Sequence, residues 1–593
     1  MRERAFSSQA PRTFGWVLSF LLLSGSLCAG TRDPAPASSS RAVAGLSPER
    51  ALALGERMYR QGLLPSGAPL RTQVSGDGPV PGSAFTCLSC HLRSGVGSVE
   101  GGVVTLPANA ARLFQPRYWK LPNLSPEARK DILAITPEAR PAYTDVTLAR
   151  VLRTGVDPTG HELHPAMPRF QLSDRNMAIL IHYLRSLSAT VSPGVDATTI
   201  HFGTVVTEEV SPEDERAMLV PINNYLARHN RYSEGFENRM YLSAGGSEMN
   251  GSYRKLALSV WRLKGPPETW GRQLEAYLAQ EPVFALLGGI SYGDWRPIHT
   301  FCEAHQLPCL LPITDLPVLS NTDWYTLYFS KGFYQEGQAA ARYLANLPAR
   351  GPVLQITQEG PAGRDLAAGF RDTWRELGRG ALKEVRLEKG ATQVSRALLQ
   401  ELLRKERPAA LLLWTSSGSF EALGDLAEAA RHPEHVFLSS RLVGARVTEL
   451  PEGARGFTRI TYPYRDPRHE PEVSKYAASL MAGLTPRNPE SRIATRVYSM
   501  IQVLRQGLAE MYLNFYRDNF LDRIGMQAEQ ALPDFLRLSF GPGQRYASKG
   551  CYIMQLSPGP DPQLLPRSEW IIHPAPTPPV TLTMRSTGDA LDF

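Results

Sequence analysis

The sequence predicts a multidomain protein in which a small all-α domain precedes a larger α/β part made of two lobes. Three observations predict this class. The chain has 593 residues, which is too long for one hydrophobic core when domains hold roughly 100–200 residues. Residues 46–190 carry apolar residues at helical spacing around a Cys-x-x-Cys-His motif. From residue 200 onward, short apolar runs alternate with longer amphipathic ones, which is typical of parallel sheets covered by helices.

The first 30 residues have the order of a secretory signal peptide. Three arginines precede the apolar run FGWVLSFLLLSGSL, and small residues follow it. The run is shorter than the roughly 20 apolar residues that cross a bilayer, so we predict cleavage and no transmembrane anchor in the mature chain. Cys28 is a candidate for lipidation, but Leu27 stands where lipoprotein signals resemble one another in having Gly, Ala or Ser. We therefore expect a periplasmic or secreted protein without a lipid at Cys28.

The remaining boundaries follow from changes in composition. Residues 31–45 are rich in Pro, Ala and Ser and lack apolar periodicity, which is typical of a flexible linker. The predicted organisation is a signal peptide at 1–30, a flexible linker at 31–45, the helical domain at 46–190, a linker at 191–199, the two α/β lobes at 200–580 and a tail at 581–593.

Charge and motif content exclude several function classes. The net charge of +7 is spread along the chain without a Lys/Arg block, so we expect no nucleic-acid partner. The chain has no HExxH pair or Walker loop, and no pair of carboxylates stands out by its spacing. We therefore do not expect an enzyme.

The most specific motif is AFTCLSCHLRSGVGS at residues 84–98, where His91 directly follows the pair Cys87 and Cys90. A tetrahedral zinc site would need a second Cys or His pair, and none follows within the next forty residues. A thioredoxin-like dithiol would follow a strand, whereas the residues before this motif are loop-like. Outside the cytoplasm, Cys-x-x-Cys-His is the attachment pattern of a c-type haem.

The haem chemistry accounts for each residue of the motif. Each thiol adds across one vinyl group of the haem, and the adjacent histidine is thereby held under the iron as an axial ligand. We expect one covalently attached haem c at Cys87 and Cys90, with His91 on the iron. A structural disulfide between the two cysteines is the alternative.

A haem iron that only transfers electrons is usually six-coordinate, so a second axial ligand should follow in the chain. Met167 precedes Pro168 in a loop ahead of a predicted helix, and the proline presents the methionine rigidly. Its rivals are His161, His164, Met177 and His182. Because Met177 and His182 fit the packing and polar faces of the helix, we favour Met167, with His164 as the next candidate.

Residues 46–188 resemble a class I cytochrome c domain. The resemblance rests on an N-terminal helix with Gly55 and Tyr59, the Cys-x-x-Cys-His motif, the dipeptide MP at 167–168 and a last helix ending in YLRSLS. It implies a covalent haem c with His91 and Met167 as axial ligands. The segment at 99–145 is longer than a minimal cytochrome needs, and we expect part of it to cover the haem edge.

The α/β part shows its elements as alternating runs. Strands are predicted at 200–206, 256–263, 283–289, 308–312, 351–357, 409–414 and 435–440, and helices at 272–280, 337–347, 363–378 and 395–406. Cys302 and Cys309 are expected at a helix end and in the next strand, where a disulfide and two buried thiols are both open.

The order of these elements resembles a type 1 periplasmic solute-binding protein of the branched-chain amino acid receptor kind. The stretches that carry the resemblance are VFALLGGISYGD at 283–294, LPCLLPITD at 307–315, YTLYFSKGFYQEGQAAARYL at 325–344, PAGRDLAAGF at 361–370 and RIATRVYSMIQVLRQGLAEM at 492–511. The resemblance covers residues 200 to about 575. It implies two α/β lobes that are joined by hinge strands and close on a ligand.

Candidate solute-binding residues lie where strands end. Gly289 and Ser291 occupy a strand-to-helix turn that matches the family's carboxylate-binding loop, and Thr314 matches the loop after the next strand. Trp414 and Ser416 follow a strand of the second lobe and are expected to face the cleft. A tight turn with a helix cap explains residues 288–291 equally well.

Arg441 departs from the resemblance in a way that bears on the ligand. Amino-acid receptors of this family have an acid at the corresponding loop, which pairs with the ligand's ammonium group. Arg441 at that position favours an anionic ligand such as a small carboxylate. Asp315 and Asp365 are nearby in the sequence pattern, so an amino acid remains open.

Three functions are compatible with this combination. The first is a periplasmic carrier of single electrons that exchanges them with a redox partner protein, while the lobes sense a small molecule or dock that partner. The second is a solute receptor whose haem reports binding, which requires unequal solute affinity in the two redox states. The third is a scaffold without a solute that docks a periplasmic dehydrogenase.

Overall fold

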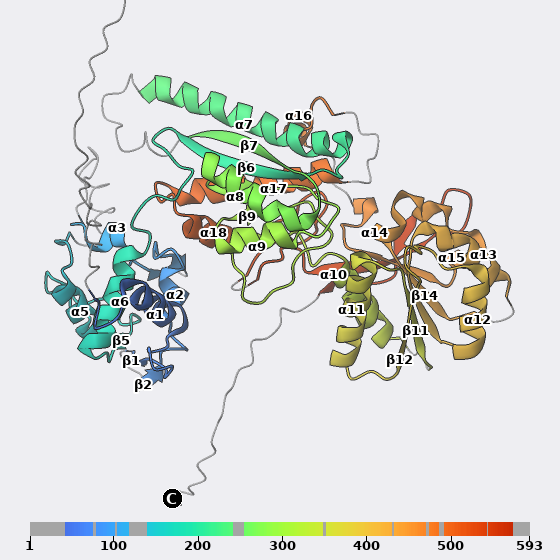
Figure 1. Cartoon of the computed structure of the whole chain (residues 1–593), viewed down its shortest axis with the longest axis horizontal. Coiled ribbons are helices and arrows are strands. Elements are labelled where there is room, and N and C mark those ends of the chain that lie inside the picture. The colour runs from blue at the N-terminus through green and yellow to red at the C-terminus, as the bar shows by residue number, and fades with distance from the viewer. Residues whose placement is uncertain are drawn as a thin grey trace, which may run out of the picture.

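Figure 1 shows a small helical domain in the N-terminal part of the chain and two α/β lobes beside it. The computed structural model describes residues 42–74, 79–100, 103–117, 139–240, 254–347, 351–429, 432–469, 474–484, 492–541 and 544–572. The predicted signal peptide with Cys28, most of the first linker and the tail lie outside these residues. Within the ranges just given, no helix is long and apolar enough to cross a membrane.

Two helices form the centre of the N-terminal domain. Helices α1 (Pro48–Gln61) and α6 (Asp174–Ser186) each begin after a serine whose hydroxyl accepts a backbone N–H of the first turn. They cross at Gly55, where a Cβ atom would lie 2.5 Å from Tyr183 Cβ. Only glycine permits this close approach.

Shorter elements complete the domain around an apolar cluster of its own. They are α2 (Cys87–His91), α3 (Ala110–Leu113), α5 (Asp145–Thr154), β1 (Arg71–Gln73), β2 (Pro79–Pro81), β3 (Val99–Glu100), β4 (Val103–Val104) and β5 (Arg169–Phe170). The strands form an antiparallel sheet in the order β2-β1-β5 and a β3-β4 pair. The sequence predicts helices alone here, because strands of two or three residues leave no alternating pattern to detect.

The first lobe is built on a parallel sheet in the order β10-β9-β8-β6-β7. Its strands are β6 (Thr199–Thr207), β7 (Lys255–Leu263), β8 (Ala285–Leu287), β9 (Cys309–Leu310) and β10 (Thr326–Leu327). Its helices are α7 (Pro212–Met240), η1 (Pro267–Thr269), α8 (Trp270–Gln280), α9 (Arg296–Ala304), α17 (Ile493–Met511) and α18 (Arg517–Gly525). The last two come from far along the chain, and Figure 1 shows α18 on the side of the lobe that faces the N-terminal domain.

The second lobe holds a larger mixed sheet in the order β12-β11-β13-β14-β15-β16-β17. Its strands are β11 (Val353–Thr357), β12 (Leu382–Arg386), β13 (Ala410–Trp414), β14 (His435–Ser439), β15 (Thr458–Tyr462), β16 (Gly550–Leu556), β17 (Leu564–Pro566) and β18 (Ile571–Ile572). Strands β11 to β15 run parallel, whereas β16 is antiparallel to β15, β17 and β18.

Helices cover both faces of this second sheet (Figure 1). They are α10 (Phe333–Ala345), α11 (Pro361–Glu376), α12 (Arg396–Glu406), η2 (Ser417–Ser419), α13 (Phe420–Glu428), α14 (Ser440–Val443), η3 (Gly444–Glu449) and α15 (Glu452–Arg455). The segment after β15 contains η4 (Pro467–His469) and α16 (Lys475–Leu480), and α16 packs against α7 of the first lobe.

The chain passes from the first lobe to the second between β10 and α10, returns after β15, and crosses again between Ser548 and β16. At the first crossing Gly332 has a φ of 60°, and a Cβ atom there would lie 2.2 Å from the carbonyl oxygen of Asp315. Glycine is therefore required at this crossing. The predicted two-lobed α/β fold of the C-terminal part is confirmed, because each predicted strand and helix has its counterpart among β6 to β14 and α8 to α12.

Candidate functional site

Helix α2 places Cys87, Cys90 and His91 of the Cys-x-x-Cys-His motif on little more than one helical turn. Thr86 begins the helix, and its hydroxyl accepts from Ser89 N. The thiols of Cys87 and Cys90, three positions apart on this helix, are both free, with Cys90 exposed and Cys87 half-buried. Residues three apart lie on the same helix face, so both thiols can reach one flat group.

The imidazole of His91 is held in one tautomer. Its Nδ1 lies 2.8 Å from the carbonyl oxygen of Leu106, and a carbonyl accepts only, so Nδ1 carries the hydrogen. Burial lowers the pKa of His91 below its usual value. The ring is therefore neutral at pH 7, with the lone pair of Nε2 available to a metal.

Met167 packs against the same apolar cluster as Cys87. Arg169 fixes its loop, since the guanidinium donates to the carbonyl oxygen of Met167 and, at 3.2 Å, to that of Leu163. The loop that carries the predicted second axial ligand is therefore restrained beside the cluster that Cys87 touches.

The rivals of Met167 have other surroundings. His164 is exposed, and its Nδ1 accepts from Ala166 N at 3.2 Å. Met177 lies in the domain core with 2% of its surface exposed. His182 Nε2 lies 3.2 Å from the carbonyl oxygen of Pro48. The assignment of Met167 as the second ligand stays a prediction.

The residues on α2 are compatible with a covalently attached haem. Among the residues that the structure describes, no three His, Cys, Asp or Glu side chains gather as a metal site, and a haem needs only two protein ligands for its iron. A redox dithiol needs a thiol with a lowered pKa, whereas burial raises the pKa of Cys87 to about 12.

The turn after β8 in the first lobe binds a carboxylate of the same chain. Ser291 Oγ, Tyr292 N and Gly293 N donate to Glu209 Oε1 at 2.9, 3.1 and 3.3 Å. Thr207 Oγ1 donates to the same oxygen at 2.7 Å. Although burial raises the pKa of Glu209, these hydrogen bonds hold it below its usual value. The predicted anion-binding turn therefore exists, but its donors already have an acceptor.

The backbone of this turn needs its glycines. Gly289 has a φ of 94°, and a Cβ atom there would lie 2.7 Å from the ring of Trp295. Residues 289–293 also read Gly-x-Ser-x-Gly, the pattern of a nucleophile elbow. Ser291 is 2% exposed and donates to a carboxylate, not to an imidazole base, so the turn lacks the arrangement of an activated serine.

A charged cluster joins the two lobes. Thr314 Oγ1 accepts from Leu316 N at 3.1 Å and shapes the loop from which Asp315 projects. Asp315 Oδ1 lies 3.2 Å from Arg441 Nη1 of the second lobe and 3.4 Å from Arg496 Nη1 of α17. Two of the predicted residues, Thr314 and Arg441, are thus brought to one place between the lobes.

Arg441 is almost entirely enclosed. Its side chain is 6% exposed, Nε lies 3.6 Å from Glu336 Oε1, and the guanidinium stacks 5.4 Å from the ring centre of Tyr464. Burial raises the pKa of Glu336 to about 7, even though Arg441 and the hydroxyl of Thr461 favour its ionised form. Arg441, which the sequence analysis expects to bind an anionic ligand, is therefore paired with two carboxyl groups of the chain itself.

Two predicted second-lobe residues lie elsewhere. Trp414 is fully buried, and its Nε1 donates to Gln355 Oε1 at 2.8 Å. The expectation that Trp414 faces the cleft is therefore wrong, because the ring fills the core of the second lobe. Ser416 is half-buried at the carboxyl end of β13, where its N–H donates to Thr392 O at 2.8 Å.

Sequence reasoning missed Glu209, Glu336 and Arg496. Glu209 follows the carboxyl end of β6. Ligands bind at the carboxyl ends of parallel strands, so the predicted strand was the one signal that could have identified this residue. Glu336 and Arg496 stand in the first turns of α10 and α17 and carry no sequence signal of their own. Cys302 and Cys309 are both buried free thiols in the structure.

Comparison with protein families gives one match. A family model described as periplasmic binding protein matches residues 232–557, which is more than half of the chain. No curated protein matches the chain at a significant level.

Several solved structures are similar to the chain in part. A putative branched-chain amino acid ABC transporter from Rhodospirillum rubrum is 13% identical, with 62% of this chain and 100% of that chain covered and a TM-score of 0.47. A solute-binding protein from Rhodopseudomonas palustris HaA2 in complex with p-hydroxybenzoic acid is 14% identical, with coverages of 63% and 97% and a TM-score of 0.47. An ABC transporter substrate-binding protein from Sphaerobacter thermophilus is 15% identical, with coverages of 63% and 98% and a TM-score of 0.48.

Proposed function

Because this chain belongs to the periplasmic binding protein family, we propose that it is a periplasmic solute receptor whose N-terminal domain carries one covalently attached haem c. The two-lobed fold and the charged cluster between the lobes support the receptor half of this proposal. The placement of Cys87, Cys90 and His91 on α2 supports the haem half.

The charged cluster between the lobes carries the receptor proposal. Arg441 and Arg496 supply two positive charges, and Asp315 and Glu336 supply two carboxyl groups. Arg496 Nε is buried without a hydrogen-bond partner, and Arg441 Nε and Glu336 Oε1 face each other at 3.6 Å, slightly beyond hydrogen-bond distance. Because buried polar atoms are normally paired, a ligand that enters as the lobes part can add bonds there. A small carboxylate would meet the arginines, and the ammonium group of an amino acid would meet the carboxylates.

The haem proposal assigns a role to each residue around α2. Cys87 and Cys90 form the thioether bonds, and Leu106 keeps His91 in the tautomer that leaves Nε2 free. Met167 is the second axial ligand that we propose. A haem held there would supply a one-electron Fe(III)/Fe(II) couple.

We assign the haem a reporting role. A solute that binds one redox state more tightly must shift the midpoint potential, because linkage between two sites is reciprocal. The first solutes to test are small carboxylates and amino acids, which match the charges of the cluster.

The test of the receptor is ligand-induced stabilisation of the full-length holoprotein. A solute at 100 times its dissociation constant should stabilise the fold by about 2.7 kcal/mol, measured as a rise in the thermal midpoint. Arg496→Ala should abolish this rise, whereas Arg505→Ala, further along α17, should keep it. No rise with pooled carboxylates or pooled amino acids would contradict the receptor proposal.

The test of the haem is its covalent attachment. Denatured wild-type protein should retain the absorbance of haem, and Cys87→Ala/Cys90→Ala should lose it. A wild-type chain that releases its haem on denaturation, or has none after expression with the haem-attachment machinery, would contradict the assignment.

Electron exchange with a periplasmic redox partner is a second candidate function. Cys90 is exposed, and Phe85 beside the motif is 40% exposed. An attachment edge at the surface lets a partner approach the haem. Reoxidation by such a partner at a rate that no solute changes would favour this function over the reporting role.

A further inference from the structure

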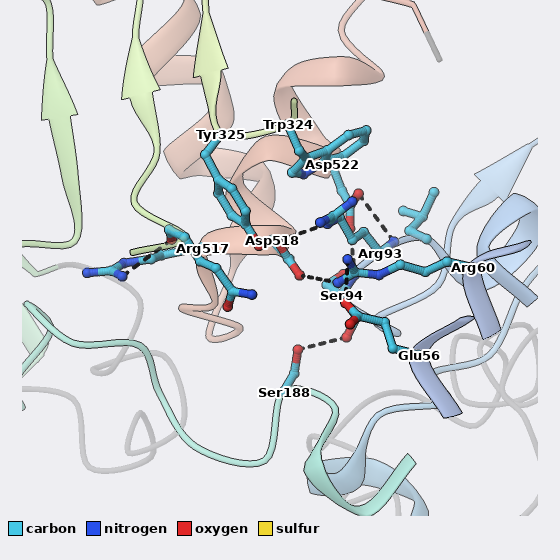
Figure 2. A network of polar contacts seen from close by, with 12 residues as sticks. Glu56, Arg60, Arg93, Ser94, Ser188, Trp324, Tyr325, Arg517, Asp518 and Asp522 are labelled. Carbon is cyan, nitrogen blue, oxygen red and sulfur yellow. Dashed lines mark hydrogen bonds and ion pairs between the residues drawn. The ribbon is translucent and has the colours of Figure 1, made fainter. Parts of the chain in front are cut away.

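Helix α18 of the first lobe contacts the loop that follows the haem motif. Figure 2 shows the two parts of the chain meeting through Asp522 and its neighbours. Asp522 Oδ1 accepts from Arg93 N at 3.3 Å, and Oδ2 accepts from Ser94 N at 2.9 Å. The next residue of the helix contacts a later part of the same loop, because Arg523 Nη2 donates to Gly97 O at 3.0 Å. Two adjacent side chains of α18 therefore hold backbone atoms at both ends of residues 93–97.

This loop is tied in turn to the backbone of the haem motif. Gly97 N donates to His91 O at 3.1 Å, and Ser98 Oγ donates to Cys90 O at 3.2 Å. On the other side, Tyr59 OH donates to Leu92 O at 2.8 Å. A displacement of the loop would therefore move the residues that are to attach and ligate the haem.

Asp518, one turn before Asp522, adds charged contacts to the same junction. Its carboxylate lies 3.5 Å from Arg60 Nη2 and 3.5 Å from Arg93 Nε, and Tyr325 OH donates to it at 3.0 Å. The guanidinium of Arg93 also stacks 4.7 Å from the ring centre of Trp324. The junction thus combines a charged cluster with an aromatic contact, and the Asp518 side chain is only 19% exposed.

We propose that α18 positions the haem-attachment loop, with Asp522 and Arg523 as the positioning residues, so that the reduction potential of the haem depends on the docking of the first lobe. This inference rests on the haem of the proposed function but not on any solute. Neither residue contacts His91 itself. Both act through the loop, whose order sets how closely water approaches the haem and how firmly His91 is held.

The decisive feature of the test is that the two positioning residues carry opposite charges. If Asp522 and Arg523 act through loop position, Asp522→Ala and Arg523→Ala each loosen the loop and shift the midpoint potential in the same direction. If they act only through their charge, removal of a negative and of a positive group shifts the potential in opposite directions. Asp522→Asn keeps an oxygen acceptor, so its midpoint potential should be closer to that of the wild type than the potential of Asp522→Ala.

The measurement is a redox titration of the visible spectrum of full-length holoprotein without added solute. We expect both alanine variants to lower the midpoint potential, because a loosened loop admits water to the haem. The expected shift is about 59 mV, which is a tenfold change in the equilibrium of a one-electron reduction. Asp145→Ala removes a carboxylate that pairs with Arg185 in the same domain and is the matched control, with no shift expected. Hydrogen exchange at the amides of Arg93 and Ser94 should accelerate in Asp522→Ala.

The outcomes separate this inference from the proposed function. A wild-type chain without covalent haem contradicts the proposed function before any variant is made. A wild-type chain with haem, whose potential is unchanged in both alanine variants or moves in opposite directions, overturns the positioning role and leaves the haem assignment standing. Should Asp522→Ala fail to fold, Arg523→Ala and Asp522→Asn still decide the question.

Discussion

Arg441 Nη1 of the second lobe lies 3.2 Å from Asp315 Oδ1 of the first lobe. The same guanidinium reaches Glu336 on α10, so one buried cation joins carboxyl groups of both lobes. Any anionic solute that uses Arg441 must therefore displace a carboxylate that the chain itself supplies.

Replacement of Arg441 should be costly because it leaves Glu336 buried without its cation. Removal of one partner of a buried ion pair typically costs about 3–5 kcal/mol, so Arg441→Ala should lower the stability of the lobes by that order, measured by urea unfolding. The double variant Glu336→Gln/Arg441→Met, which leaves neither charge, should recover most of the loss. A loss no larger than that of the surface variant Arg446→Ala, whose side chain is 58% exposed, would contradict the assignment.

Glu336 should make stability depend on pH. Burial raises its folded-state pKa from 4.5 to about 7, so the folded chain binds more protons than the unfolded chain between these values. The contribution of Glu336 to the free energy of unfolding is fully present below pH 4.5 and falls as the pH rises towards 7. The fall is at most about 1.4 kcal/mol per pH unit. Glu336→Gln does not titrate, so its stability relative to the wild type should improve across this window and stay level above it. A difference that is constant with pH would contradict the shift.

Removal of the Glu209 carboxylate should create a site for an external one. Glu209→Ala leaves Ser291 Oγ and the N–H group of Tyr292 without their acceptor, and the N–H group of Gly293 keeps only its bond to Ser291 Oγ. The expected loss of stability is about 1 kcal/mol, because Glu209 itself is exposed. Millimolar acetate should restore the thermal midpoint of the variant and leave the wild type unchanged. If acetate affects both proteins equally, the turn does not select a carboxylate.

The second axial ligand can be tested by spectroscopy. Met167→Ala should abolish the spectrum of a methionine-ligated low-spin haem, because the sulfur that the loop presents is lost. His164→Ala is the matched control in the same loop and should leave the spectrum unchanged. The reverse result, with the change in His164→Ala alone, would assign the ligand to that histidine.

Features carried by neighbouring residues could be predicted from the sequence. The placement of Cys87 and His91 on one turn follows from a local motif, and the contact of Gly55 with Tyr183 follows from two helices with matching small and aromatic residues. The parallel sheets follow from the alternation of apolar and amphipathic runs.

Contacts between distant segments could not be predicted in the same way. The sequence places Ser291 in an anion-binding turn, but it does not show that Glu209 folds back onto that turn. It assigns Arg441 to an anionic ligand, because the sequence does not show that Asp315 of the first lobe pairs with this arginine of the second lobe. The contact of Asp522 with Ser94 joins residues that are 428 positions apart, and no periodicity or motif reports such a pair.

The two candidate sites are connected through α17 and α18. Arg496 near the start of α17 contacts Asp315 between the lobes, and Asp522 on α18 contacts the loop after the haem motif. The two helices pack closely at Gly507, where a Cβ atom would lie 3.0 Å from Ile524 Cγ1. A rearrangement of the lobes that moves α17 therefore also moves α18, which contacts the loop after the Cys-x-x-Cys-His motif.

The most direct test of the reporting role is the midpoint potential of the full-length holoprotein with and without a solute that stabilises it. We predict a shift of the midpoint potential on saturation with solute, with about 59 mV for each tenfold difference in affinity between the two redox states. An identical midpoint potential at saturating solute would show that the haem does not report binding and would overturn the reporting role.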